Sequence, residues 1–207
     1  RRWDLTGYLE TRDQRSSAST AGQRRAWTDG RVISLLDAES GSILMRWSAS
    51  GAAGQGHAGA VNAVTVSPDG NRVASVGDDG TLRLWDPVRE ALLITREFGP
   101  DSLNVVAYSP DGELLAVAGH RGRLTLLSPS GQHKRSLRGH EDDILALSFS
   151  ADGKRLLSGD TTGLALVWDM FEPIARLRGH KGAVTALGFR ADATQVASAG
   201  ADGTLRI

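Results

Sequence analysis

The chain has 207 residues, enough for one large domain or two small ones, and its 40% hydrophobic and 23% charged residues exclude global disorder. The 24 basic side chains balance 24 acidic ones, so no net charge draws the protein toward nucleic acid or anionic lipid. The sequence has no cysteine, which excludes disulfides, thiolate nucleophiles and cysteine-bound zinc.

No apolar run approaches the roughly 20 residues of a membrane helix, and the first 25 residues carry six arginines without an apolar signal core. We therefore expect no membrane association and a cytoplasmic location. Arginine outnumbers lysine 21 to 3, which is typical of GC-rich, bacterial coding sequence. The chain begins without methionine and ends inside a repeated pattern, so we expect a piece of a longer protein.

A short phrase recurs along the chain and defines a repeat. It reads SPDG at 67–70 and 109–112, SADG at 150–153 and RADA at 190–193, starting 42, 41 and 40 residues apart. The repeat unit is therefore about 41 residues long, which indicates a repeat architecture.

The N-terminal part carries the repeat in a reduced form. WDLTGYLE at 3–10 reads as the end of a partial unit (1–11), and residues 12–47 read as a degenerate unit with strands in TDGRVISLLD (28–37) and GSILMRW (41–47). Residues 12–27 are polar, with no apolar alternating strand before the turn at 28–30, so poor order is expected there. Two explanations stay open: a degenerate unit, or a segment absent from the sequence.

The unit at 57–96 shows the pattern most clearly. Apolar and polar residues alternate in AVNAVTV, RVASV and TLRLW with the period of two of a strand, PDG and DDG mark tight turns, and ALLIT at 91–95 follows as a fourth strand. We expect four short antiparallel strands per unit. The pattern recurs at 98–138, at 140–178 and, cut off after its third strand, at 180–207.

The units share Gly-His near their start and Trp-Asp near the end of the third strand. The matching pairs are Gly56-His57 with Trp85-Asp86, Gly139-His140 with Trp168-Asp169, and Gly179-His180. This pattern of residues resembles that of the WD-repeat β-propeller family, which implies an all-β fold of four-stranded antiparallel blades around an axis. The chain would be a single propeller domain (1–207) or part of one: an arc of about five blades from a larger propeller of about seven. A closed five-unit ring is the alternative.

Family units hold a buried structural tetrad of histidine, serine or threonine, aspartate and tryptophan. The resemblance places it on His57, Ser75, Asp79 and Trp85; on His140, Ser158 and Trp168, with Thr162 in place of the aspartate; and on His180, Ser198 and Asp202. In the unit at 98–138 the four positions hold Gly99, Val117, Arg121 and Leu127. We expect that blade to rely on apolar packing.

The sequence contains no phosphate-binding, serine-hydrolase or zinc-hydrolase signature, so we expect no enzyme activity, no catalytic residues and no cofactor. The Gly-His histidines recur in separate units, which spreads them around the axis, and His120 and His133 have no ligand at suitable spacing, so no metal is expected. GAAGQG at 51–56 leads into a strand, which favours a connector. Arginines 12, 15, 24 and 25 lack an aromatic platform apart from Trp27, so nucleic acid is not an expected partner.

In the family, the loop after Gly-His and the turn before the third strand emerge on one face. The corresponding partner-binding residues predicted here are Asp78, His120, Arg121, Glu141, Asp142, Asp143, Thr161, Lys181 and Ala201. Their mixed charges favour electrostatic selection of a protein or peptide partner, other domains of the same polypeptide included. The resemblance thus implies a non-catalytic interaction scaffold, sensor or regulatory domain. The alternative is a propeller enzyme or small-ligand binder with a site in the central channel.

Overall fold

The computed structural model describes residues 17–21, 23–48, 56–169 and 172–207. They form five antiparallel sheets, named A to E, in which the strands follow one another in chain order. The strands are β1 (Ser17–Ala21), β2 (Arg24–Thr28), β3 (Val32–Asp37) and β4 (Ile43–Ser48) in sheet A; β5 (Val61–Val66), β6 (Val73–Gly77), β7 (Thr81–Asp86) and β8 (Ala91–Glu97) in sheet B; β9 (Leu103–Tyr108), β10 (Leu115–Gly119), β11 (Leu124–Leu127) and β12 (His133–Leu137) in sheet C; β13 (Ile144–Phe149), β14 (Leu156–Asp160), β15 (Ala165–Asp169) and β16 (Glu172–Leu177) in sheet D; and β17 (Val184–Phe189), β18 (Val196–Gly200) and β19 (Leu205–Arg206) in sheet E.

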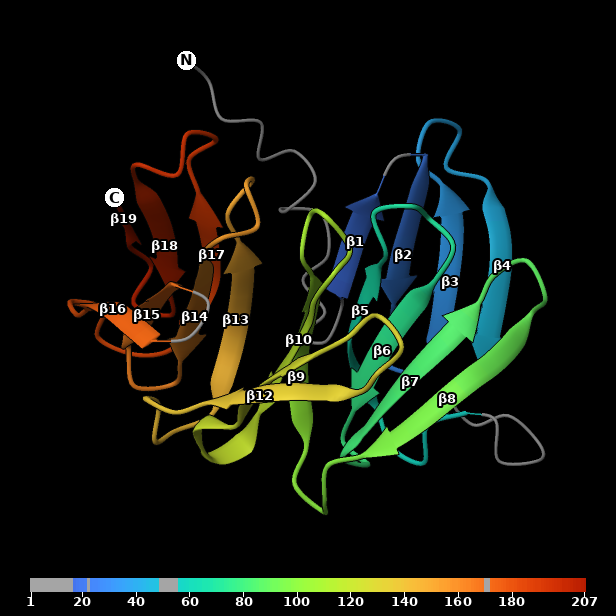
Figure 1. Ribbon diagram of the computed structural model, residues 1–207, viewed down its shortest axis with the longest axis horizontal. Coiled ribbons are helices and arrows are strands. Elements are labelled where there is room, and N and C mark those ends of the chain that lie inside the picture. The colour runs from blue at the N-terminus through green and yellow to red at the C-terminus, as the bar shows by residue number, and fades with distance from the viewer. Residues whose placement is uncertain (1–16, 22, 49–55, 170–171) are drawn as a thin grey trace.

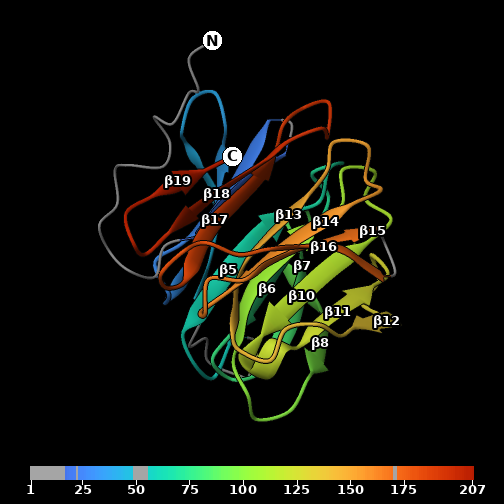
Figure 2. The ribbon, with the colours of Figure 1, turned by 90° about the vertical axis from the view of Figure 1, so that its left-hand side faces the viewer.

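The sheets stand side by side in chain order, each packed against the next (Figures 1 and 2). The first strand of each sheet meets the first strand of its neighbour: β1 contacts β5, β5 contacts β9, β9 contacts β13 and β13 contacts β17. The only helical element in the described ranges is a 3-10 turn, η1 (His120–Gly122). The all-β blade arrangement expected from the repeat is therefore present, as part of a propeller.

The turn between the first and second strands follows from the sequence SPDG. Ser67 donates its hydroxyl to the Asp69 carboxylate at 2.5 Å and accepts the N–H of Arg72 at 2.9 Å, while Gly70 takes a positive φ of 72°. Ser109 and Ser150 make the same hydroxyl contact to the aspartate two residues on. The hydroxyl bond from Ser67 and the backbone N–H of Asn71 hold the pKa of Asp69 below its usual value. The repeated phrase is thus a repeated turn.

Apolar side chains fill the spaces between neighbouring sheets. Trp47 of sheet A and Trp85 of sheet B pack with ring centroids 5.7 Å apart, Leu103 and Val117 of sheet C pack on sheet B, and Leu124 packs with Trp168 of sheet D. Each cluster takes residues from two sheets, so removing either sheet would expose the apolar face of the other. This mutual burial fixes the positions of the loops between the strands.

The N-terminal sheet corrects one expectation. A strand does precede the turn at 28–30: β2 pairs with both β1 and β3, and Ala26 is fully buried between Arg25 and Trp27. Contact with β5 of the next sheet accounts for this strand, which the alternation pattern missed. Of residues 12–27, 17–21 and 24–27 are in strands. The partial unit predicted at 1–11 and most of the 51–56 connector lie outside the described residues.

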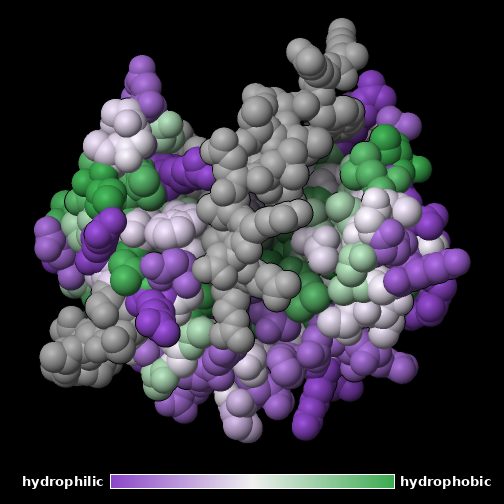
Figure 3. Space-filling view, turned by 180° about the vertical axis from the view of Figure 1, so that it is seen from behind, coloured by the Kyte–Doolittle hydropathy of each residue, from purple (hydrophilic) through white to green (hydrophobic). Residues whose placement is uncertain are grey.

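The surface seen from behind is largely hydrophilic, with separate apolar patches (Figure 3). Among the residues that the structure describes, no helix has the length and apolar character needed to cross a membrane.

Candidate functional site

A chain of hydrogen bonds runs through sheet B from an indole to a carboxylate. Trp85 donates Nε1–H to Ser75 Oγ at 2.9 Å, Ser75 Oγ lies 2.8 Å from His57 Nε2, and His57 Nδ1 lies 3.0 Å from the Asp79 carboxylate. The backbone N–H of Ala58 also bonds to Asp79, at 2.8 Å. The structure thus brings together the four side chains expected from the sequence, and the chain joins the Gly-His loop to the turn before β7.

The donors and acceptors of this chain determine the histidine tautomer. The Asp79 carboxylate can only accept, so His57 Nδ1 carries the proton and Nε2 accepts the hydroxyl proton of Ser75. Burial raises the pKa of Asp79, but hydrogen bonds from His57 and Ala58 outweigh burial and hold that pKa below its usual value. Asp79 is therefore ionised at neutral pH.

Sheet D has the same chain with a different aspartate. His140 Nε2 lies 2.7 Å from Ser158 Oγ, which accepts Trp168 Nε1–H at 2.8 Å, and His140 Nδ1 lies 2.6 Å from Asp160 Oδ2. Thr162 stands at the repeat position of Asp79, as the sequence indicated, but the carboxylate partner of His140 comes from a position that the sequence reading missed. Asp160, two residues earlier at the end of β14 and 1% exposed, accepts from His140, while Thr162 only donates to Asp160 at 2.7 Å.

Burial dominates the electrostatics of His140. It lowers the pKa of His140, and the positive charge of nearby Arg176 acts in the same direction, against the opposing effect of Asp160. Burial raises the pKa of Asp160, but hydrogen bonds from Thr162 and His140 outweigh it and leave that pKa lowered. The pair is thus a neutral imidazole donating to a carboxylate.

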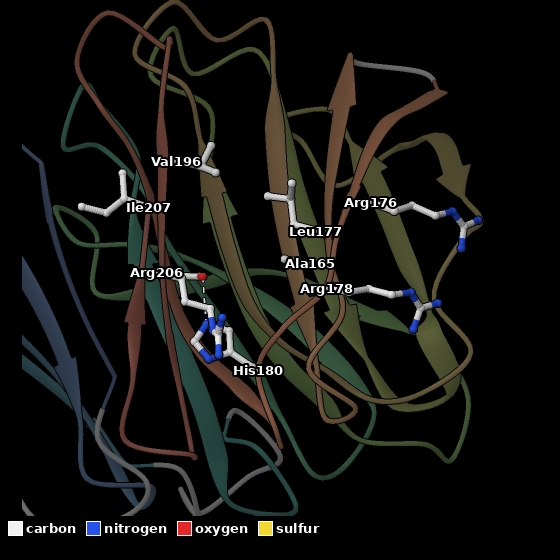
Figure 4. Close-up of a pocket in the computed structure, with 9 residues that line it drawn as sticks. Ala165, Arg176, Leu177, Arg178, His180, Val196, Arg206 and Ile207 are labelled. Carbon is white, nitrogen blue, oxygen red and sulfur yellow. Dashed lines mark hydrogen bonds between the residues drawn. The ribbon is translucent and has the colours of Figure 1, made fainter.

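In sheet E the corresponding chain of hydrogen bonds joins a histidine, a serine and an aspartate. His180 Nε2 lies 2.9 Å from Ser198 Oγ, His180 Nδ1 lies 3.1 Å from Asp202, and the N–H of Lys181 donates to Asp202 at 2.9 Å. A cavity of about 400 Å³ lies beside these residues, between sheets D and E. Arg176 and Arg178 point outward from its sheet D side, and Arg206 lies beside His180 (Figure 4).

Sheet C lacks such a chain but has a substitute that the sequence reading missed. Val117 and Leu127 are fully buried in the apolar cluster with sheet B. Arg123 donates to the carbonyl of Phe98, and its guanidinium lies 3.7 Å from the Asp101 carboxylate. Apolar packing is therefore supplemented by an arginine that fixes the loop leading into the sheet.

Four of the predicted partner-binding residues meet at the junction of sheets C and D. Asp143 Oδ1 accepts the N–H of Arg121 at 3.0 Å, Asp143 Oδ2 lies 3.6 Å from His120 Nδ1, and the Asp143 carbonyl accepts the N–H of Thr161 at 3.0 Å. Asp143 therefore joins the turn of one sheet to the turn of the next.

The remaining five predicted residues are distributed over three sheets. Asp78 in sheet B accepts from Asn62, Glu141 and Asp142 are exposed in the loop before β13, and Lys181 and Ala201 are exposed in sheet E. Within the described ranges, the structure records no side-chain hydrogen bond or ion pair between Glu141 or Asp142 and another predicted residue.

Two asparagines tie the first strands of neighbouring sheets together. Asn62 Nδ2 donates to the Leu103 carbonyl at 3.0 Å, and Asn104 Nδ2 donates to the Ile144 carbonyl at 3.1 Å. The sequence reading missed both, although an asparagine within an apolar alternating strand was a visible signal. These bonds hold sheets B, C and D in register under the loops.

The structure offers no candidate metal centre within its described part. No three histidine, aspartate or glutamate side chains there lie close enough together to hold an ion. The polar clusters are instead chains of donors and acceptors that connect one loop to another.

Antiparallel sheets that pack side by side, with a hydrogen-bonded chain at the Gly-His histidine in sheets B, D and E, define a repeat propeller. The chain matches the family described as "WD domain, G-beta repeat" over residues 52–86, 131–169 and 171–207, more than half of its length. The chain belongs to the WD-repeat family.

Similar proteins include the small ribosomal subunit protein RACK1 of Schizosaccharomyces pombe, 36% identical over 126 residues that cover 56% of this chain and 39% of that protein. RACK1 of Candida albicans is 31% identical over 129 residues, or 58% of this chain and 40% of that protein. MST50-interacting protein 11 of Pyricularia oryzae is 31% identical over 124 residues, or 55% and 38%. The chain spans about two fifths of the length of these relatives.

Proposed function

We propose that this chain is a non-catalytic protein-interaction domain whose partner contacts the face formed by the loops after Gly-His and the turns before the third strands. The observation that carries the proposal is the junction at Asp143. There the side-chain carboxylate and the backbone carbonyl of Asp143 hold the turns of sheets C and D together. Arg121, Glu141 and Asp142 remain exposed beside Asp143.

The hydrogen-bonded chains below this face support the same function. They tie the loops at His57, His140 and His180 to the following turns, so the loops are held in one arrangement before a partner arrives. A preorganised surface loses less conformational entropy on binding. Exposed charges of both signs then favour selection by electrostatic complementarity over burial of a large apolar surface.

The relatives' names are consistent with this role. One is named as an interacting protein and two as small ribosomal subunit proteins, which supports an interaction function here. A cytoplasmic location, a bacterial source, a place in a larger multidomain protein, a single domain over 1–207 and a total of about seven blades remain predictions from the sequence.

Site-specific photo-crosslinking tests the proposal. A photoreactive amino acid at Asp142, on the proposed face, is expected to capture a defined protein from cells that express the chain. The matched position is Glu113, an exposed acidic residue in the turn between β9 and β10, at the other end of the strands. Equal capture of the same protein from both positions, or capture from Glu113 alone, would show that the face is wrong.

A further inference from the structure

A cleft of about 340 Å³ between sheets C and D has an unusual concentration of arginine. It is lined by η1, by β11 and β12 and by His140, and its polar lining residues are Arg121, Arg123, Thr125, Ser136, Arg138 and His140. Among the described residues that line it there is no carboxylate. The cleft therefore combines three positive charges with two hydroxyl groups.

The three guanidinium groups differ in how they are held. Arg123 is fixed by the Phe98 carbonyl and by Asp101, whereas Arg121 and Arg138 are exposed. Within the described ranges, the structure records no hydrogen-bond or ion-pair partner for the guanidinium of either Arg121 or Arg138. The guanidinium groups of Arg121 and Arg138 are thus available to a ligand, next to that of Arg123, which is already held in place.

These arginines are not required by the tetrad. The turn before the third strand reads Asp78-Asp79-Gly80-Thr81 in sheet B and His120-Arg121-Gly122-Arg123 in sheet C. Arginine therefore replaces the aspartate that bonds to histidine in sheet B, and in sheet C the histidine itself is replaced by Gly99. The substitution reverses the charge of the turn at the point where the network has been lost.

The backbone at Arg121 is in a conformation that arginine rarely adopts. Its φ of 56° lies in the left-handed region, and its N–H donates to Asp143 Oδ1 at 3.0 Å. A Cβ atom makes this conformation unfavourable, so the bond to Asp143 holds the backbone there against a free-energy cost. The unfavourable backbone conformation therefore occurs at a residue whose guanidinium has no recorded partner within the described structure.

The same position between sheets D and E is also basic. The cavity of about 400 Å³ there is lined by Arg176, Arg178 and Arg206 beside His180, and Arg178 stands in the repeat where Arg138 stands in the preceding unit (Figure 4). Arginine-lined clefts thus recur on neighbouring sheets, although the chain as a whole has no net charge.

We propose that the cleft between sheets C and D binds an anionic side chain of a peptide partner through Arg121, Arg123 and Arg138. A planar guanidinium presents paired N–H donors that match the oxygens of a phosphate or a carboxylate, and three such groups around one cleft favour a phosphorylated serine or threonine or a glutamate. This inference rests on the proposed interaction function and specifies the chemistry of the partner.

Titration of the intact chain with three capped tripeptides, Gly-phosphoSer-Gly, Gly-Glu-Gly and Gly-Ser-Gly, tests the inference. Binding is followed by NMR of the arginine Nε–Hε resonances in ¹⁵N-labelled protein. The expected result is saturable movement of the Arg121 and Arg138 resonances with an anionic peptide and none with the serine peptide. The stronger of the two anionic peptides identifies whether the cleft recognises phosphate or carboxylate.

Two variants and one control make the result specific. Arg121→Gln and Arg138→Gln are each expected to weaken binding about tenfold. Arg31→Gln is the control, because Arg31 is an exposed arginine at the position in sheet A that Arg123 holds in sheet C, and it should leave the affinity unchanged. Circular dichroism of each variant excludes loss of folding as the cause.

Two results would overturn the inference: no saturable movement with either anionic peptide, or an equal loss of affinity in the Arg31→Gln control. Its failure is distinct from that of the interaction function. Crosslinking at Asp142 reports the partner whether or not an anion enters the cleft, and the tripeptides report the cleft whether or not a partner is found.

Discussion

Single side chains in this protein act through complete chains of donors and acceptors. In sheet D, the Trp168 indole N–H donates to Ser158, the Ser158 hydroxyl donates to His140, and His140 donates to Asp160. Each proton has one acceptor, so removal of one member leaves a buried polar group without a partner. The cost of a substitution therefore depends on which polar group loses its partner.

Trp85→Ala is expected to destabilise the protein more than Leu127→Ala. Both residues are buried at the same position of the repeat, but Trp85 also bonds to Ser75 and packs against Trp47. The tryptophan truncation should cost about 3–5 kcal/mol, and the leucine truncation less because no hydrogen bond is lost. Urea denaturation measures both. Equal free energies of unfolding would contradict the role given to the tetrad.

In sheet D the carboxylate partner of His140 is Asp160, two residues before Thr162, which stands at the repeat position of Asp79. Asp160→Asn replaces a buried charge-assisted acceptor of the His140 proton and should cost about 1.5–3 kcal/mol, whereas Thr162→Val removes only a peripheral donor and should cost about 1 kcal/mol. Thermal unfolding of the two variants ranks them. A larger loss in Thr162→Val would contradict the role given to Asp160.

The lowered pKa of His140 gives a pH dependence with a defined sign. Because the folded pKa lies below the unfolded value of about 6.5, the unfolded chain binds more protons in the interval between them. His140 therefore contributes stability that is present above the unfolded pKa and is lost as pH falls toward the folded pKa. The free energy of unfolding should decrease from about pH 7.5 to about pH 5.5. His140→Gln should flatten this slope, and an unchanged slope would exclude His140 as its source.

At the scale of strands and turns, the alternation pattern and the repeated turns were enough to predict sheets B, C and D from the sequence. They failed at β1 and β2, whose polar sequences form strands because Ala26 is buried against a neighbouring sheet. They also missed Asp160 and Arg123, since the repeat assigns roles by spacing whereas hydrogen bonds depend on where a side chain reaches. Strands and hydrogen bonds that depend on contacts between distant parts of the chain cannot be predicted from the local sequence pattern alone.

Matched glycines in two turns separate backbone conformation from close packing. Gly122 and Gly203 hold the same place in their units, with φ values of 66° and 75°. A Cβ at Gly122 would lie 2.1 Å from the His140 carbonyl oxygen, whereas a Cβ at Gly203 meets nothing within 4 Å. Gly203→Ala should cost about 1–2 kcal/mol for the left-handed conformation alone, and Gly122→Ala distinctly more. Chemical denaturation tests this, and equal costs would contradict close packing of sheets C and D.

At the scale of the molecule, two of the three matched repeat segments contribute to two sheets. Residues 131–169 supply β12 to sheet C and β13–β15 to sheet D, and residues 171–207 supply β16 to sheet D and β17–β19 to sheet E. Three features hold neighbouring sheets together: repeat segments that supply strands to two sheets, apolar clusters between sheets, and the hydrogen bonds from Asn62 and Asn104. Loops from separate repeats therefore form one continuous face.

The central claim is that this face binds a protein, and charge reversal on it is the most direct test. The measurement is the affinity of the purified, crosslink-identified partner for the Glu141→Lys/Asp142→Lys variant and for Glu39→Lys/Glu113→Lys, which places the same charge change on exposed turns at the opposite ends of the strands. We predict that the first variant changes the dissociation constant by about tenfold or more and that the second leaves it unchanged. Unchanged affinity in the first variant, or an equal change in both, would contradict the account.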